Sequence, residues 1–137
     1  MAKIALISCV SKKRSHKANA KDLYISPLFK LNLGYAKSLN PDKIFILSAK
    51  YGLVDLEDEI EPYDKTLNQM NSQAIKDWAS RVIEQLKNVA DIENDVFAFL
   101  AGERYRKYII SHIIKYEVPL KGLSIGKQLH FLKEKLK

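Results

Sequence analysis

The loop that follows the first apolar run of this sequence is dense in side chains that bind anions. The run occupies residues 3–8, and the loop after it contains the hydroxyl group of Ser11 and the cations Lys12, Lys13, Arg14, His16 and Lys17. Hydroxyl, ammonium and backbone N–H groups together hold phosphate in anion-binding loops. We therefore expect Ser11, Lys12 and Lys13 to bind an anion. The loop lacks the glycines of a mononucleotide or dinucleotide loop, so the sequence indicates no cofactor of those kinds.

A second group of candidate binding residues follows the apolar run at residues 44–47. Ser48 ends this run, and Lys50, Tyr51 and Gly52 come directly after it. In an open parallel sheet, ligands bind beyond the carboxyl ends of the strands. We therefore expect Ser48, Tyr51 and Gly52 to contact a base, and Lys50 to contact an anion. The alternative is a solvated connection after a core strand.

The elements that must position these residues alternate along the chain. Apolar runs predict strands at residues 3–8, 44–48 and 96–101, and a short segment with a proline at residues 117–120 predicts an edge strand. Amphipathic spacing predicts helices that begin at Pro27, near Ser72 and after Gly102, with a last helix at the end of the chain. This order favours an α/β fold, with a mostly parallel four-stranded sheet between helices, as a single domain over residues 1–137.

A parallel sheet brings separate loops together, because the carboxyl ends of all its strands lie on one rim. The third predicted strand ends at Gly102, and Tyr105 follows on the next helix. Gly122 and Gly126 lie between the fourth strand and the last helix. Gly102 and Tyr105 are therefore further candidates for binding a base, and Gly122 and Gly126 for binding an anion.

The composition is that of a globular domain with a basic surface. The chain has 137 residues, with 23 lysine and arginine residues against 16 acidic residues, and a formal net charge of +7. This excess favours a polyanionic partner, which we expect to be a nucleic acid or a nucleotide. No apolar run is long enough for a membrane span and the start of the chain does not resemble a signal peptide, so we expect a cytoplasmic protein without a membrane partner. A single cysteine, and histidines without metal-ligand spacing, indicate neither a metal nor another cofactor.

Five segments of the sequence together resemble the DUF6884 family, whose function is unknown. They read ISCVSKK, DLYISPLFK, ILSAKYGLVDLEDEIEPYDKTL, LAGERYRKYI and PLKGLSIGKQLHFL. The segment from Ser48 to Asp64 is also similar to a motif of the YaaA peroxide-stress family, whose members are linked to DNA binding. Cys9 and Lys13, with the residues after them, resemble part of a motif of archaeosine synthase, which modifies a base in tRNA. These resemblances imply a three-layer α/β domain like that of uracil-DNA glycosylase, and a function that involves nucleobases.

The first function class that the sequence leaves open is an enzyme that acts on a modified nucleobase or on its N-glycosidic bond. Such an enzyme needs a carboxylate to activate water or to stabilise a positively charged sugar, and Asp64 is the first candidate and Glu61 the second. Cys9 is a candidate nucleophile if nearby lysines stabilise its thiolate, and otherwise a packed strand end. An extruded base would also need aromatic side chains for stacking, and the candidates are Tyr24, Tyr51 and Tyr63.

Two other function classes also remain open. A nucleic-acid-binding module without chemistry would keep the lysines and tyrosines in the same roles, and would use the carboxylates for structural hydrogen bonds. A nucleotide sensor, or a subunit of a larger modification complex, would do the same. The sequence alone does not distinguish an enzyme from these two.

Overall fold

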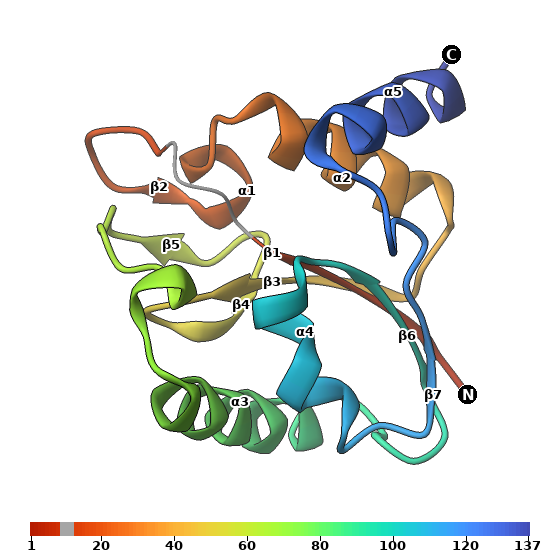
Figure 1. Ribbon diagram of the computed structural model, residues 1–137. Helices are drawn as coiled ribbons and strands as arrows, with labels where there is room; N and C mark the ends of the chain where they lie inside the picture. Colours follow the sequence, from red (N-terminus) through yellow and green to blue (C-terminus); the bar gives the residue numbers. More distant parts are fainter. Residues whose placement is uncertain (9–12) are drawn as a thin grey trace.

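A five-stranded sheet with helices on both faces forms the centre of this computed structural model, which describes residues 1–8 and 13–137 (Figure 1). The strands are β1 (Lys3–Ser8), β2 (Ala18–Asn19), β3 (Lys43–Ser48), β4 (Gly52–Asp55), β5 (Glu59–Ile60), β6 (Val96–Leu100) and β7 (Lys115–Glu117). The helices are α1 (Ala20–Leu23), α2 (Pro27–Ser38), α3 (Ser72–Lys87), α4 (Glu103–Ile110) and α5 (Ile125–Lys135), with a short 3₁₀ helix η1 (Leu67–Gln69).

The strands of the central sheet lie in the order β4-β3-β1-β6-β7. β1 pairs in parallel with β3 on one side and with β6 on the other, and β7 continues the parallel part beyond β6. The prediction that residues 3–8, 44–48 and 96–101 form neighbouring parallel strands is therefore confirmed. β2 and β5 form a separate antiparallel pair.

The predicted four-stranded sheet was wrong by one strand. β4 pairs antiparallel with β3 at the edge of the sheet, with Ser48 opposite Gly52 and Phe45 opposite Asp55. The segment after Ser48 was expected to form a binding loop, and only two apolar residues, Leu53 and Val54, precede its acidic part. The tight reversal is possible because Gly52 has a φ of 77°, a backbone conformation that favours glycine.

The predicted edge strand at residues 117–120 was also misplaced. The structure has β7 at Lys115–Glu117, and Pro119 lies beyond its end. All three residues of β7 are exposed, so the strand carries no apolar signal of its own. Its place in the sheet comes from backbone pairing with β6.

The two faces of the sheet carry separate hydrophobic cores, because successive side chains of a strand point to opposite faces. Along β1, Ile4 and Leu6 pack into one core and Ala5 and Ile7 into the other. α3 and α4 cover the first core, and α2 and α5 cover the second (Figure 1). The expected placement of helices on both faces is confirmed.

Side chains cap the two longest helices as the sequence predicts. The Ser26 hydroxyl accepts a hydrogen bond from the backbone N–H of Phe29, and Pro27 occupies the first turn of α2. The side chain of Asn71 accepts one from the backbone N–H of Ala74 at the start of α3.

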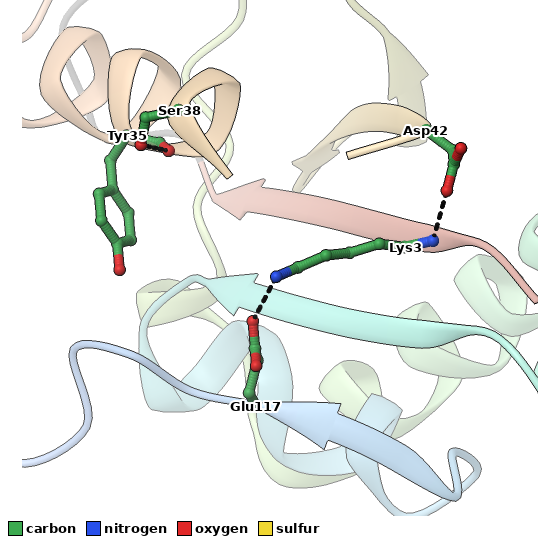
Figure 2. Close-up of polar contacts among 5 residues, drawn as sticks. All are labelled: Lys3, Tyr35, Ser38, Asp42 and Glu117. Carbon is green, nitrogen blue, oxygen red and sulfur yellow. Dashed lines mark hydrogen bonds and ion pairs between the residues drawn. The ribbon is translucent and has the colours of Figure 1, made fainter. Parts of the chain in front are cut away.

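Lys3, at the amino end of β1, contacts the residue before β3 and the last residue of β7 (Figure 2). Its backbone N–H donates to the carboxylate of Asp42, just before β3, at 2.8 Å. Its ammonium group pairs with Glu117 of β7 at 3.1 Å. In the same view, the Ser38 hydroxyl donates to the backbone carbonyl of Tyr35 at the end of α2.

Asp95 fixes the start of β6 to the start of the chain. Its carboxylate accepts hydrogen bonds from the backbone N–H groups of Asp91, at 2.8 Å, and Ala2, at 2.7 Å. These two bonds lower the pKa of the Asp95 carboxyl, because they stabilise its charged form.

We predict that Asp95→Asn lowers stability near neutral pH and makes it less sensitive to acid. The pKa of Asp95 is lowered on folding, so its contribution is complete above the ordinary carboxyl pKa of about 4 and is lost as the pH falls through the lowered value. Urea unfolding at pH 7, 5 and 3 measures this, with the exposed Glu93→Gln as control. A stability difference from wild type that stays constant over this pH range would contradict the prediction.

Candidate functional site

The connections of the sheet diverge between β1 and β6. The chain leaves the carboxyl end of β1 and returns through α2 to β3, on one side of β1. It leaves the carboxyl end of β6 and returns through α4 to β7, on the other side. In open α/β sheets, ligands bind in the crevice at such a topological switch point.

A cavity of about 840 Å³ opens at this point, and we call it the switch-point cavity. Ligand pockets of proteins have volumes of about 300–1,000 Å³, so its size suits a small organic ligand. The carboxyl ends of β1 and β6 contribute to its lining, and so do one side of α2, the first turns of α4 and α5, and η1 with the start of α3. Its lining includes polar residues, cations and glycines, namely Ser8, Asn32, Gly102, Arg104, Arg106, Lys107 and Gly122.

The first turn of α4 gives the cavity a positively charged wall. The first backbone N–H groups of a helix have no partner within the helix, and the helix dipole places partial positive charge there. Arg104 and Arg106 add two cations to this turn, against one carboxylate, Glu103, and Lys107 follows in the last turn of the helix. The guanidinium of Arg106 donates to the backbone carbonyl of Ala101 at 2.9 Å, which anchors it beside the end of β6.

Gly102 opens the space in front of this turn. Its N–H donates to the Ser8 hydroxyl at 3.3 Å, which joins the ends of β1 and β6. A Cβ atom added at Gly102 would meet no atom within 4 Å. A ligand can therefore approach the backbone of the α4 turn closely.

Asn32 is the cavity residue that sequence reasoning missed. It lies on the buried side of α2, between Phe29 and Ala36, and is 4% exposed. No hydrogen-bond partner of its side-chain carbonyl oxygen Oδ1 is found in the part of the chain that the structure describes. Its spacing was the only sign of burial in the sequence, because Asn32 stands three positions after Phe29 and four positions before Ala36, on the same side of the helix.

The segment before α5 forms the third wall. Gly122 has a φ of 82°, so the turn there favours glycine. The side-chain amide of Gln128 donates to the backbone carbonyl of Leu123 at 2.9 Å, and the Ser124 hydroxyl caps α5. These bonds hold the segment in place next to the cavity.

The cavity brings together three of the predicted site residues, Gly102, Tyr105 and Gly122. Tyr105 is 9% exposed, and its ring packs edge-on against Trp78 with the centroids 5.6 Å apart. Gly126 lies instead in the first turn of α5, beside a smaller hollow of about 430 Å³. Gly102 and Gly122 therefore line the same cavity, and their roles in binding stay predictions.

The remaining aromatic candidates form a separate group, the tyrosine cluster, which consists of Lys13, Tyr24, Ser48, Tyr51 and Tyr63. The hydroxyl of Tyr63 lies 2.8 Å from that of Tyr24 and accepts a hydrogen bond from the Ser48 hydroxyl at 2.8 Å. The ring of Tyr51 packs edge-on against that of Tyr63. The ammonium of Lys13 lies 4.4 Å from the centroid of the Tyr63 ring, within the range of a cation–π interaction.

Ser48 and its neighbours attach the tyrosine cluster to α3. The buried Ser48 hydroxyl accepts hydrogen bonds from the backbone N–H groups of Tyr51 and Lys50, and the Ser48 carbonyl accepts one from the indole of Trp78. The side chain of Gln85 accepts from the N–H of Leu53 and donates to the carbonyl of Tyr51. The stretch after β3 is therefore held by the long helix.

The predicted catalytic carboxylates lie on the surface beyond this cluster. Glu61 and Asp64 are both exposed, and the Tyr51 hydroxyl donates to the backbone carbonyl of Glu61 at 3.3 Å. Lys50 is also exposed, 5.2 Å from the centroid of the Tyr51 ring. The other predicted residues, Cys9, Ser11 and Lys12, lie outside the described residues.

Carboxylates of the β4–β5 segment pair with part of the basic loop. Lys17 pairs with Glu59 at 2.9 Å and Lys21 with Glu57 at 2.7 Å. In each case the hydrogen bond to the glutamate raises the pKa of the lysine, and the charge of the glutamate adds to the effect. The crowding of cations in the sequence is therefore partly neutralised in the folded chain.

The topology and the cavity place the protein in the doubly wound α/β class, with an antiparallel edge strand. The chain belongs to the DUF6884 family, a family of unknown function, whose model matches residues 4–134. No curated protein and no solved structure matches it. Among the described residues, no helix combines the length and apolar character needed to cross a membrane.

We predict that Ser48→Ala destabilises the protein by about 1–3 kcal/mol, because it leaves buried backbone N–H groups and the Tyr63 hydroxyl with one partner fewer. Urea unfolding measures the change. Ser80→Ala, at an exposed position of α3, is the matched control and should change stability by less than about 0.5 kcal/mol. Equal effects of the two substitutions would show that the Ser48 hydroxyl is not a structural centre of the cluster.

Proposed function

We propose that this protein binds a nucleotide, free or within a nucleic acid, in the switch-point cavity. The observation that carries the proposal is the meeting of a cavity of suitable size with the cationic first turn of α4 at the topological switch point. Helix N-termini are favourable positions for phosphate groups, and Arg104, Arg106 and Lys107 add charge for the same purpose. The formal net charge of +7 also favours an anionic ligand.

The nucleobase part of the ligand is suggested by the motifs rather than by the charge. The likeness to the YaaA family and to archaeosine synthase, and the uracil-DNA glycosylase-like arrangement that it implies, belong to this proposal. The mixed lining of the cavity supports it too. The half-buried apolar residues Leu28 and Leu123 offer surface to a flat ring, whereas the α4 turn offers charge.

The tyrosine cluster extends the proposed binding surface along the same rim. It lies at the carboxyl end of β3, and the cavity lies at the carboxyl ends of β1 and β6, which follow β3 in the sheet. A nucleic acid whose terminal or extruded nucleotide occupies the cavity would pass Tyr51 and Lys50 on the surface. A free nucleotide would occupy the cavity alone.

We predict that Arg104→Gln weakens the binding of nucleoside 5′-monophosphates by about tenfold, because it removes a cation from the α4 turn. Binding of AMP, GMP, CMP and UMP is measured by isothermal titration calorimetry. Arg81→Gln is the matched control, because Arg81 is an exposed residue of α3 and the same charge is removed.

The salt dependence of oligonucleotide binding gives a second measurement of the same prediction. For a single-stranded oligonucleotide, Arg104→Gln should reduce the slope of log K against log salt by about 0.7 per lost phosphate contact. An equal effect of Arg104→Gln and Arg81→Gln on affinity and slope would mean that only the net charge matters, and would refute the assignment of the cavity.

A nucleobase-acting enzyme is the extension of this function that the sequence motifs suggest. If the protein hydrolyses N-glycosidic bonds, we expect chromatography to detect free base after incubation with nucleotides or with oligonucleotides that carry modified bases. Glu103→Gln should then abolish base release if cleavage takes place in the cavity, which Glu103 lines, and Asp64→Asn should abolish it only if cleavage takes place beside the tyrosine cluster, because Asp64 lies outside the cavity. Absence of base release from every substrate would identify a binding or sensing protein.

A further inference from the structure

We propose that Asn32 recognises the ligand of the switch-point cavity by accepting a hydrogen bond from an N–H group of its nucleobase. This inference rests on the proposed nucleotide-binding function of the cavity. It specifies that the site would recognise the hydrogen-bonding edge of the base, and that Asn32 is the residue that would recognise it.

The position of Asn32 does not favour a polar side chain on structural grounds. The residue lies on the buried side of α2, between Phe29 and Ala36, where the helix faces the sheet. With 4% of its surface exposed and no partner of Oδ1 among the described residues, it carries the cost of an unsatisfied buried acceptor. An apolar residue of similar size would avoid this cost. Asn32 lines the cavity where that ligand would lie, and its carbonyl oxygen, which is shielded from solvent in the ligand-free protein, would be satisfied once the side chain turns towards a ligand donor.

The opposite walls of the cavity carry groups that would bind different ends of one ligand. Arg104 and Lys107 lie on α4, which covers one face of the sheet, and Asn32 lies on α2, which covers the other. A ligand that satisfies both walls carries an anionic group at one end and an N–H donor at the other. A nucleoside monophosphate has this form.

The side-chain amide also explains why a base edge is a better match than a simple amine. It carries an acceptor and a donor side by side, and bases present donor and acceptor atoms side by side on their edges. Asparagine pairs with adenine in this bidentate way in protein–DNA complexes. The geometry therefore points to recognition of a base by α2 and of a phosphate by α4.

Asn32→Leu tests the inference, because leucine fills a similar volume without an acceptor. For the nucleotide among AMP, GMP, CMP and UMP that binds wild type most tightly, we expect the variant to bind about ten- to a hundredfold more weakly. The thermal midpoint of the ligand-free variant should equal or exceed that of wild type. Asn88→Leu, at an exposed position after α3, is the control and should change neither property.

A second comparison changes the ligand instead of the protein. The same nucleotide is compared with an analogue whose base lacks the N–H donor, for example purine riboside 5′-monophosphate for AMP or 3-methyluridine 5′-monophosphate for UMP. Wild type should bind the analogue at least about tenfold more weakly, and Asn32→Leu should bind nucleotide and analogue equally, because the two changes remove the same hydrogen bond.

The outcomes separate this inference from the proposed function. If wild type binds a nucleotide and Asn32→Leu binds it equally well, the inference is overturned, and a buried water molecule would be the partner of the amide. A fall in the thermal midpoint of ligand-free Asn32→Leu would overturn it as well, since the amide would then be structural. If wild type binds none of the four nucleotides, both the proposed function and this inference fail.

Discussion

The parallel pairing of β1 on both of its sides is the constraint on which the rest of the structure depends. A strand in this position has both faces buried, so its central residues must be apolar, and Ile4, Ala5, Leu6 and Ile7 are all fully buried. Because β3 and β6 flank it, the chain must pass over one face of the sheet to reach the first and over the opposite face to reach the second. The two helical layers, the two cores and the divergence of the loops above β1 all follow from this arrangement.

The same constraint explains which parts of the fold could be predicted. β1, β3 and β6 are apolar runs because they are buried, and α3 shows a regular apolar stripe because one side of it packs on the sheet. β4 and β7 lie at the edges, where backbone pairing suffices: the side chains of β7 are exposed, and β4 has only four residues with a glycine at its start. A reading based on burial patterns therefore finds the centre of a sheet and misses its edges.

Some residues of the candidate site could likewise be predicted from the sequence, and others could not. Gly102 and Gly122 could be placed from the sequence because the carboxyl ends of parallel strands share a rim. Sequence reasoning did not separate residues that line a cavity from residues that hold a loop to a helix, because Ser48 and Tyr51 have the composition of a binding loop and are engaged with Tyr63, Trp78 and Gln85. Asn32 was missed for the opposite reason. A single amide inside a helix is unremarkable until the structure shows that it is buried.

In the ion pairs Lys17–Glu59 and Lys21–Glu57, the glutamates compete with any polyanion for the two lysines. A lysine that already holds a carboxylate gains less from contact with an approaching phosphate chain, because Glu57 or Glu59 must be displaced and rehydrated first. The formal charge of this loop therefore overstates its attraction for nucleic acid. Added salt weakens the internal pairs as well as the external attraction, so the two effects partly offset each other. The positively charged surface that is free to attract an anion is consequently smaller than the lysine content suggests. Less of it lies on this loop, and more of it lies at the first turn of α4.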